Sequence, residues 1–255
     1  MKIGTDPEFF IQKDGRVISA IGVVGGSKKR PIELSNICSV HEDNVAMELN
    51  VCPAESEDEL LGNVTLAIKE SLAHAGEGVS IHDKSLHRFD EASLDNPKAR
   101  RSGCSGERDA VTGLKIPSPR LNRTNDRCVG GHIHVSIDDD MKNRKGYLRV
   151  VSMMDLFLGV PSVVLDEDRE RRRLYGKSSS FRPKPYGLEY RVLSNFWLLK
   201  EEYIRWVFRN TEIAVESAKK MDVDMGLIHL SKSVIDTYNE HDARVLIEQY
   251  NIPMP

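Results

Sequence analysis

Four short segments of this chain each carry two polar or ionisable side chains separated by one uncharged residue. They are Asp6 and Glu8, Glu48 and Asn50, His132 and His134, and Glu189 and Arg191. Residues i and i+2 of a β-strand point to the same face, so each pair predicts a strand with one polar face and one face free to pack on a core. Together the pairs indicate a single sheet with a concave, highly charged face.

Local patterns predict the elements around these pairs. A β-hairpin is expected over residues 9–20, because Lys13–Arg16 places Asp-Gly in its turn. Ser56–Glu59 is a capping box that begins a helix, and Gly76 is its expected end. Further strands are expected over residues 45–51 (stopped by Pro53), 129–137 and 188–192, and helices over 148–164, from 199 onward and within 231–250.

Two stretches lack periodic pattern and are expected to be long loops, at residues 84–128 and 166–187. Strands separated by helices and long loops predict an α+β fold with a mostly antiparallel sheet. We expect one domain over residues 1–255, with the loop insertion at about 84–128.

The composition is that of a soluble globular protein, with 40% hydrophobic and 29% charged residues and a net charge of −3. Neither nucleic acid nor an anionic membrane is therefore an expected partner, although a base on DNA stays open as a substrate. The N-terminus has no signal-peptide pattern, and no stretch approaches the roughly 18 apolar residues of a membrane span. The four cysteines form no CxxC motif, so we expect free thiols and a cytoplasmic location, the host cytoplasm if a phage encodes the chain.

The residue types in the pairs point to metal and phosphate chemistry. Carboxylates with imidazole suit divalent metals, and Mg²⁺ is usually held by a few carboxylates together with substrate phosphates. The acids would repel one another without a cation between them. Basic side chains that suit phosphate oxygens lie on the last strand, at Arg191, and in the loop before it, at Arg173, Lys177 and Arg182. This equipment is typical of phosphoryl transfer.

Three further features of the sequence bear on the candidate site. Gly130-Gly131 allows close backbone approach beside His132, so Gly-Gly-His-Ile-His-Val-Ser is more specific than an isolated His-x-His. Cys104 is interpreted as a turn cysteine in preference to a catalytic thiol. The run Arg169–Arg173 is either a solvated face or a binding site for carboxylate or phosphate, and the sequence does not decide between them.

The chain also resembles a known superfamily. Gly-Gly-His-Ile-His-Val-Ser and Glu189-Tyr190-Arg191 are similar to motifs of glutamine synthetases, and Asp6-Pro7-Glu8 is similar to their first-strand acid pair. The resemblance is strongest to the phage-encoded carboxylate–amine ligases of type 2. Over roughly residues 1–200 the chain carries, in the order of that family, GTDPEFF, DNVAMELN, SGCSGERDAVTG, GGHIHVS and LYGKSSSFRPKPYGLEYR.

This resemblance implies a glutamine-synthetase-like catalytic fold, in which a curved antiparallel sheet has helices packed on its convex side. It implies that ATP and Mg²⁺ or Mn²⁺ bind in the concavity. The γ-phosphoryl group would move to a substrate carboxylate, and an amine would attack the resulting acyl phosphate. The expected partners are small-molecule or peptide carboxylates and amines, while their identity and the oligomeric state stay open.

The resemblance also implies roles for single residues. Asp6 and Glu8 would bind separate metals, with Glu48 as a further ligand. His132 and Glu189 would complete the metal that bridges the nucleotide phosphates. The nucleotide would contact His134, Lys177, Arg173, Arg182 and Arg191, of which Arg182 and Arg191 act in catalysis with Glu189, and Asn50 would orient substrate.

Two structural questions follow from these roles. The acidic partner of Glu48 is either Glu42 or Asp43, both of which neighbour His41. Pro7, between the first two acids, predicts an edge strand or a strand start.

Three other functions fit the same residues. A guanidino-kinase-like phosphotransferase would use the same fold without forming an amide. A Zn²⁺ hydrolase would use His132, His134 and a carboxylate. A non-catalytic phage interaction protein would carry the pairs only as a solvated sheet face.

Overall fold

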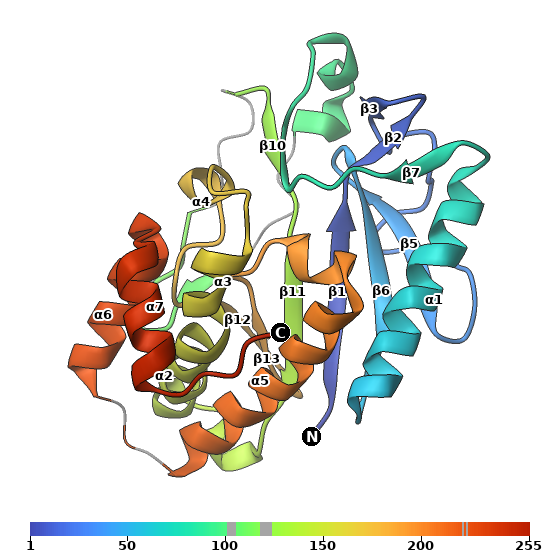
Figure 1. Ribbon diagram of the computed structural model, residues 1–255. Helices are drawn as coiled ribbons and strands as arrows, with labels where there is room; N and C mark the ends of the chain where they lie inside the picture. The colour runs from blue at the N-terminus through green and yellow to red at the C-terminus, as the bar shows by residue number, and fades with distance from the viewer. Residues whose placement is uncertain (101–105, 118–123, 221, 223) are drawn as a thin grey trace.

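The computed structural model describes the whole chain except residues 101–105, 118–123, 221 and 223. Within the described residues the main sheet has eight strands in the order β4-β5-β6-β1-β11-β13-β12-β9 (Figure 1). Its strands are β1 (Ile3–Phe9), β4 (Ile32–Glu33), β5 (Cys38–Asp43), β6 (Ala46–Ala54), β9 (Arg108–Asp109), β11 (Gly131–Ser136), β12 (Ser180–Lys184) and β13 (Gly187–Tyr190). Every described pair in it is antiparallel, which confirms the predicted α+β class.

Two small sheets flank the main one. The first joins β3 (Arg16–Ile18), β2 (Ile11–Lys13) and β7 (Val79–Ile81), and the second joins β10 (Asp126–Cys128) and β8 (Leu86–Arg88). The predicted hairpin is confirmed, since Lys13 pairs with Arg16. Asp14 and Gly15 both have positive φ, at 50° and 73°, as a tight two-residue hairpin turn requires.

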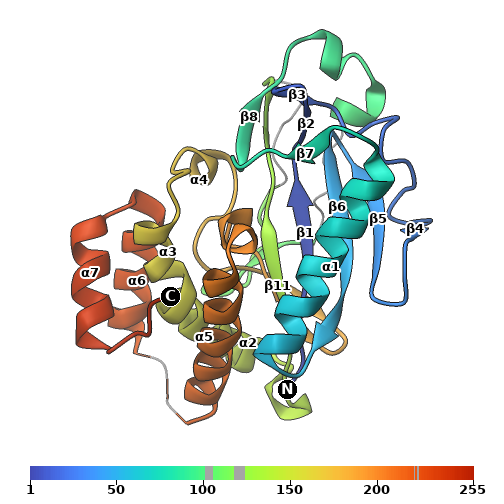
Figure 2. The same ribbon diagram turned by 45° about the vertical axis from the view of Figure 1, so that its right-hand side comes forward.

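Helices cover one face of the main sheet. They are α1 (Glu57–Ala75), α2 (Arg144–Met154), a π-helical turn η5 (Asp155–Gly159), α3 (Val160–Leu165), α4 (Arg171–Leu174), α5 (Glu201–Lys220), α6 (Met225–Thr237) and α7 (Glu240–Gln249). Short 3₁₀ turns are η1 (Ala92–Leu94), η2 (Pro97–Arg100), η4 (Asp139–Met141) and η6 (Asn195–Leu199). Helices α1, α5 and α2 lie side by side over the sheet, and α6 and α7 pack outside α3 (Figures 1 and 2).

Strand periodicity sorts the side chains into two faces. Ile3, Met47, Leu49, Ile133 and Leu188 are fully buried and belong to the main hydrophobic core beneath these helices. Alternate residues of the same strands, including the predicted polar pairs, point the other way. Burial of the apolar set fixes the register, because a shift of one residue would bury the charged set.

The helix predictions are largely confirmed. The Ser56 hydroxyl accepts a hydrogen bond from the Glu59 amide, and the Gly76 amide bonds to the Leu72 carbonyl, so α1 has the expected caps. The tail forms two helices, α6 and α7, with the first beginning at Met225.

The two predicted loops are wrong in part. Residues 84–128 contain β8, β9, β10, η1 and η2, and residues 166–187 contain α4 and β12. Pro183 lies within β12 and is tolerated there because β9 pairs only with Ser180 and Phe181. Pro183 therefore lies where β12 is an edge.

Two prolines correct the strand predictions. Pro53 lies inside β6 and does not stop it, because the register with β1 shifts there and leaves Pro53 at an irregularity. Pro7 lies in β1, a central strand between β6 and β11, and not at an edge. It pairs with Gly131, while the register between β1 and β6 carries no pair at Pro7.

The expectation that no stretch is long and apolar enough for a membrane span is also corrected. Residues 144–165, which form α2, η5 and α3, reach a mean hydropathy of 1.7 over their most apolar part. However, 78% of that part is buried inside the protein. Burial against the sheet and α5 accounts for this composition, as in the core helix of a soluble protein.

Candidate functional site

The strand register brings the four polar pairs together on one sheet face. Asp6 of β1 lies opposite His132 of β11, and Glu8 lies opposite Glu48 of β6. On the other side of β11, Glu189 of β13 lies between His134 and Arg182. The shared polar face predicted from the i, i+2 spacing is thereby confirmed.

The first group of potential metal ligands is Asp6, His132 and Glu189, whose ligand atoms lie within 4.8 Å of one another. The His132 Nδ1 atom is 3.3 Å from Asp6 Oδ1 and 3.7 Å from Glu189 Oε1. His132 and Glu189 are almost fully buried. His134 is adjacent, with its Nε2 atom 3.1 Å from Asp6 Oδ1.

Electrostatics leaves this first group in a metal-binding protonation state. Burial, reinforced by the Arg191 guanidinium, lowers the pKa of His132 to about 3, so its imidazole is neutral at physiological pH. Burial would raise the pKa of Asp6, but the contacts with His134 and His132 together hold it well below its usual value. A neutral imidazole beside an ionised carboxylate is the form that binds divalent metals.

Basic side chains surround the buried Glu189. The Arg182 guanidinium donates hydrogen bonds of 2.9 and 3.1 Å to its two oxygens, and the Lys184 ammonium lies 2.8 Å from Oε2. Arg191 also pairs with Glu189, and its Nε donates to the Tyr175 hydroxyl over 2.7 Å. The site therefore places acids and permanent cations side by side, as phosphate binding requires.

The second group of potential ligands is Glu8, Asp43 and Glu48, again with ligand atoms within 4.8 Å. The Gly130 amide donates to Glu8 Oε2 over 2.8 Å. Burial, together with repulsion from Glu48 and Asp43, raises the pKa of Glu8 well above its usual value. Burial and Glu48 likewise raise the pKa of Asp43 to about 6. Three acids this close favour a cation between them.

The geometry decides between the two acids considered as partners of Glu48. Asp43 shares the polar face of the sheet, whereas Glu42 points to the other side of β5. Glu42 accepts hydrogen bonds from the Gly22 and Gly25 amides, and Lys98 lies 3.0 Å from its Oε2 atom. Asp43 is therefore the acid that joins Glu48.

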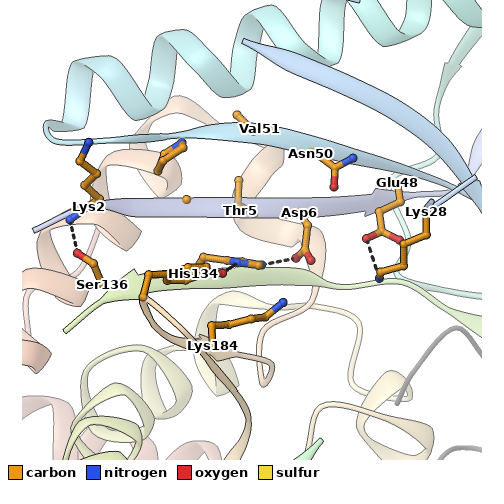
Figure 3. A pocket seen from close by; sticks show the side chains of 13 residues that line it. Lys2, Thr5, Asp6, Lys28, Glu48, Asn50, Val51, His134, Ser136 and Lys184 are labelled. Atoms are coloured by element: carbon orange, nitrogen blue, oxygen red, sulfur yellow. Dashed lines mark hydrogen bonds and ion pairs between the residues drawn. The ribbon is translucent and has the colours of Figure 1, made fainter. Parts of the chain in front are cut away.

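A pocket of about 440 Å³ opens beside the first group (Figure 3). Its lining residues are Lys2, Gly4, Thr5, Asp6, Lys28, Glu48, Asn50, Val51, Pro53, His134, Ser136, Lys184 and Tyr186. Asn50 is exposed at its edge and donates a hydrogen bond of 3.0 Å to the Ser39 hydroxyl. The Tyr186 ring stacks on His134, and its hydroxyl shares a hydrogen bond with Nδ1 of that histidine. Three lysines make this pocket suitable for an anionic ligand.

The two glycines before His132 serve close packing. A Cβ atom at Gly131 would lie 2.5 Å from Trp197 Nε1 and 2.7 Å from the Ser194 carbonyl oxygen. At Gly130 it would lie 2.6 Å from His132 Nε2. Gly131 therefore lets β11 approach Trp197 and Ser194 closely, and Gly130 leaves space for the His132 ring.

Two of the predicted nucleotide contacts lie outside this cluster of described side chains. Arg173 is exposed and pairs with Glu170 at 2.8 Å, and Lys177 is exposed in the segment between α4 and β12. In the same run, Arg171 and Arg172 are buried, and Arg171 donates to the Val129 and Val192 carbonyls. The run is therefore neither a wholly solvated face nor one anion site. Cys104 lies outside the described residues.

The sequence analysis did not identify Lys2, Lys28, Lys184 and Tyr186 on this face, and it left His41 unassigned. His41 lies opposite Glu48, Lys28 approaches Glu48 at 3.6 Å, and Lys184 and Tyr186 line the pocket. His41 and Lys184 have the same i, i+2 spacing as the original pairs. One position separates His41 from Asp43 and Lys184 from Arg182. Neither segment is predicted as a strand, so the i, i+2 spacing gives no prediction there.

Several observations show that the two acidic groups fit divalent metals. Asp6 Oδ1 and Glu48 Oε2 are buried and have no hydrogen-bond partner among the described residues. The donor set combines carboxylates with one neutral imidazole in the first group and is carboxylate-only in the second. The first group contains His132 but not His134, which is not the donor set expected of the alternative zinc hydrolase.

Comparison with models of protein families shows which family the chain belongs to. The model of the phage phiEco32-like COOH.NH2 ligases, type 2, matches residues 122–251, just over half of the chain. The chain belongs to this family. The matched part contains His132, His134, Glu189 and Arg191, while the acids of β1, β5 and β6 lie before it. No curated protein matches the chain.

Membership in this carboxylate–amine ligase family supports carbon–nitrogen ligation as the enzyme class. It also gives the predicted resemblance to type 2 ligases an independent basis.

Proposed function

We propose that this phage-type ligase forms an amide from a carboxylate and an amine, using ATP and Mg²⁺, on a glutamine-synthetase-like catalytic domain that spans the chain. The observation that carries the proposal is the Asp6–His132–Glu189 group, which lies beside a 440 Å³ pocket and beneath Arg182, Lys184 and Arg191. Metal ligands, basic side chains and an anion-sized pocket on one sheet face are the parts that ATP-dependent phosphoryl transfer needs.

In this proposal the nucleotide occupies the pocket next to the first group. Its volume lies within the range of about 300–1,000 Å³ that is usual for small-ligand sites. Lys2, Lys28 and Lys184 offer positive charge along the pocket, and Gly4 leaves its floor without a side chain. His134, held by Tyr186, contacts the nucleotide between the pocket and Asp6.

Two metal sites follow from the two acidic groups. Asp6, His132 and Glu189 would hold one ion, and Glu8, Asp43 and Glu48 the other. When bound, such ions neutralise phosphate charge and polarise the transferred group. Arg182 and Arg191 are positioned by their pairing with Glu189 to bind the same phosphate oxygens.

The reaction has two steps. A carboxylate oxygen of the first substrate attacks the γ-phosphorus, the bond to the β-phosphate oxygen breaks, and ADP and an acyl phosphate form. The uncharged amine of the second substrate then attacks the acyl carbon, the acyl–oxygen bond breaks, and inorganic phosphate leaves while the amine proton passes to a base. Asn50, exposed at the pocket edge, would orient substrate.

The test is to measure ADP and free phosphate separately with the full chain, ATP and Mg²⁺, across a matrix of carboxylates and amines. A ligase predicts stoichiometric ADP and phosphate that require both substrates. ADP without free phosphate, and without a need for an amine, would instead identify a phosphotransferase. If no combination of substrates produces ADP, both the ligase and the phosphotransferase functions are contradicted, whether or not the nucleotide binds.

Glu189→Gln and Glu42→Gln make a matched pair for this assay. The first removes a carboxylate from the proposed site, and the second removes one from the opposite side of the sheet. Turnover is expected to fall at least tenfold in the first variant, as the loss of a group at a metal site usually causes. Turnover in the Glu42 variant should equal that of the wild type.

A further inference from the structure

His41 is a site residue without an assigned role. It belongs to β5, where it lies opposite Glu48 of β6, and it shares a sheet face with Asp43 two positions later. Only 1% of its surface is exposed. Strand geometry therefore points its imidazole at the second acidic group and not at the hydrophobic core.

The imidazole of His41 contacts the Glu48 carboxylate, and that contact is poorly directed for a hydrogen bond. Its Nε2 atom lies 3.2 Å from Glu48 Oε2, yet neither ring nitrogen has a hydrogen-bond partner of suitable geometry among the described residues. Glu48 Oε2 is in the same condition. Buried polar atoms of a purely structural histidine are normally hydrogen-bonded. Two buried ligand atoms 3.2 Å apart, neither of them in a well-directed hydrogen bond among the described residues, are an arrangement that a shared cation would stabilise.

We propose that His41 is a nitrogen ligand of the second cation site, in addition to Glu8, Asp43 and Glu48, and that this site prefers a first-row transition ion such as Mn²⁺ to Mg²⁺. Magnesium favours oxygen ligands and retains its waters, whereas an imidazole adds affinity for transition ions. The inference rests on the proposed function only in treating the second acidic group as a cation site. It requires neither ATP nor ligase activity.

The competing role for His41 is that of an outer partner, which would donate a hydrogen bond to Glu48 without touching the ion. Such partners also affect metal affinity. The two roles differ in one observable, because only a direct ligand places nitrogen in contact with the ion. The decisive experiment must therefore detect metal–nitrogen coupling and not affinity alone.

The first experiment is pulsed electron paramagnetic resonance of Mn²⁺ bound to the His132→Asn/His134→Asn variant, which removes both imidazoles beside Asp6. Nitrogen hyperfine coupling from the remaining site is expected. It should disappear when His41→Gln is added. Bound Mn²⁺ without nitrogen coupling in the His132→Asn/His134→Asn variant, or no bound Mn²⁺ at all, would overturn the proposal. Because this measurement leaves His41 intact, it stands even if the triple variant fails to fold.

The second experiment is calorimetry of Mn²⁺ and Mg²⁺ binding to the wild type, His41→Gln and His229→Gln. His229 is exposed on α6 and serves as the control. For His41→Gln we expect one class of Mn²⁺ sites to weaken about tenfold or more, with little change for Mg²⁺. Equal losses for both ions would indicate an outer partner and reject the ligand role.

The two proposals fail separately. If His41 behaves as described but no substrate pair supports ADP formation, the ligase assignment falls while the metal ligand stands. If turnover requires both substrates but the remaining Mn²⁺ shows no nitrogen coupling, the ligase assignment stands and the role of His41 is rejected.

Discussion

Glu42 and Asp43 are consecutive residues of β5, yet their environments differ because alternate strand residues face opposite sides. Asp43 lies among Glu8 and Glu48, and burial together with repulsion from Glu48 raises its pKa to about 6. Glu42 accepts bonds from backbone amides and from Lys98, and these lower its pKa against the effect of burial. Whether an acid of β5 joins the second group depends on which face of the strand its position points to, more than on whether it is Asp or Glu.

The first prediction compares Asp43→Asn with Glu42→Gln. Losing the Asp43 carboxylate should reduce divalent-ion affinity on the order of 10- to 100-fold, since one charged ligand of the second group is removed. Glu42→Gln should bind ions like the wild type. Isothermal titration with Mn²⁺ measures both variants, and a larger loss in Glu42→Gln would mean that the faces of β5 are assigned the wrong way round.

Some site residues could be predicted from the sequence and others could not. Asp6, Glu8, His132, His134, Glu189 and Arg191 were found because their spacing matches the strand period. Lys184 has the same spacing from Arg182, but it lies within residues 166–187, which were predicted as a loop. Its strand is possible only because β9 is too short to pair there, and that length could not be read from local sequence. Lys28 had no periodic signal at all.

At the scale of elements, the entrance to β11 depends on the absence of side chains. Gly131 packs against Trp197 and the Ser194 carbonyl at the start of η6. The Trp197 indole also donates to the Gly131 carbonyl over 3.1 Å. Close contact between strand and 3₁₀ turn therefore holds His132, the next residue, in its position beside Asp6.

The second prediction contrasts two glycine substitutions. Gly131→Ala should lower the free energy of unfolding by about 1–3 kcal/mol, because the new Cβ has no space. Gly62→Ala is the control, since Gly62 lies in α1 with nothing within 4 Å of an added Cβ, and it should stabilise by about 0.5–1 kcal/mol. Urea denaturation measures both. Equal effects in the two variants would contradict the packing described for β11.

The π-helical turn η5 has a structural task behind the sheet. It directs Asp155 toward the Tyr190 hydroxyl, which donates over 2.7 Å, and toward the Ser179 amide, which donates over 2.8 Å. Tyr190 separates Glu189 from Arg191, and Ser179 precedes β12. Asp155 thus ties the helical layer to the two strands that carry the basic side chains. Burial raises its pKa from 3.8 to about 7 in the folded protein.

The third prediction is the pH dependence that this raised pKa causes. The folded state binds the proton of Asp155 more tightly than the unfolded state, so its contribution is fully present below about pH 4 and is lost as pH rises to about 7. Relative to Asp155→Asn, the wild type should lose on the order of 4 kcal/mol of unfolding free energy over that range. Urea titrations at several pH values measure the difference, and a difference independent of pH would contradict the raised pKa.

Helices were more predictable than strand ends. The limits of α1 followed from Ser56 and Gly76, which act locally through caps. By contrast, Pro7 and Pro53 were interpreted by a rule for edge strands and strand ends, and both lie inside paired strands. Their tolerance depends on the register between β1 and β6, which is a property of two segments and cannot be inferred from either one alone.

For the whole molecule, the order of the strands in the sheet was the main feature that could not be predicted from the sequence. The pairs predicted one polar face, but not that Asp6 would oppose His132, or that Glu8 would oppose Glu48. Those partners lie far apart in the chain, and helices α1 and α5 must cover the other face before the pairing is stable. The division into two acidic groups is therefore a result of topology, while the residue types in each group were visible from the start.

The central claim is that the first acidic group and the adjacent pocket bind ATP through a divalent metal. The most direct measurement is calorimetry of a non-hydrolysable ATP analogue with the full chain, with and without Mg²⁺. Binding in the presence of Mg²⁺, and its loss both in the absence of metal and in Glu189→Gln, is the predicted result. No detectable binding at millimolar nucleotide, or equal binding by Glu189→Gln, would contradict the account.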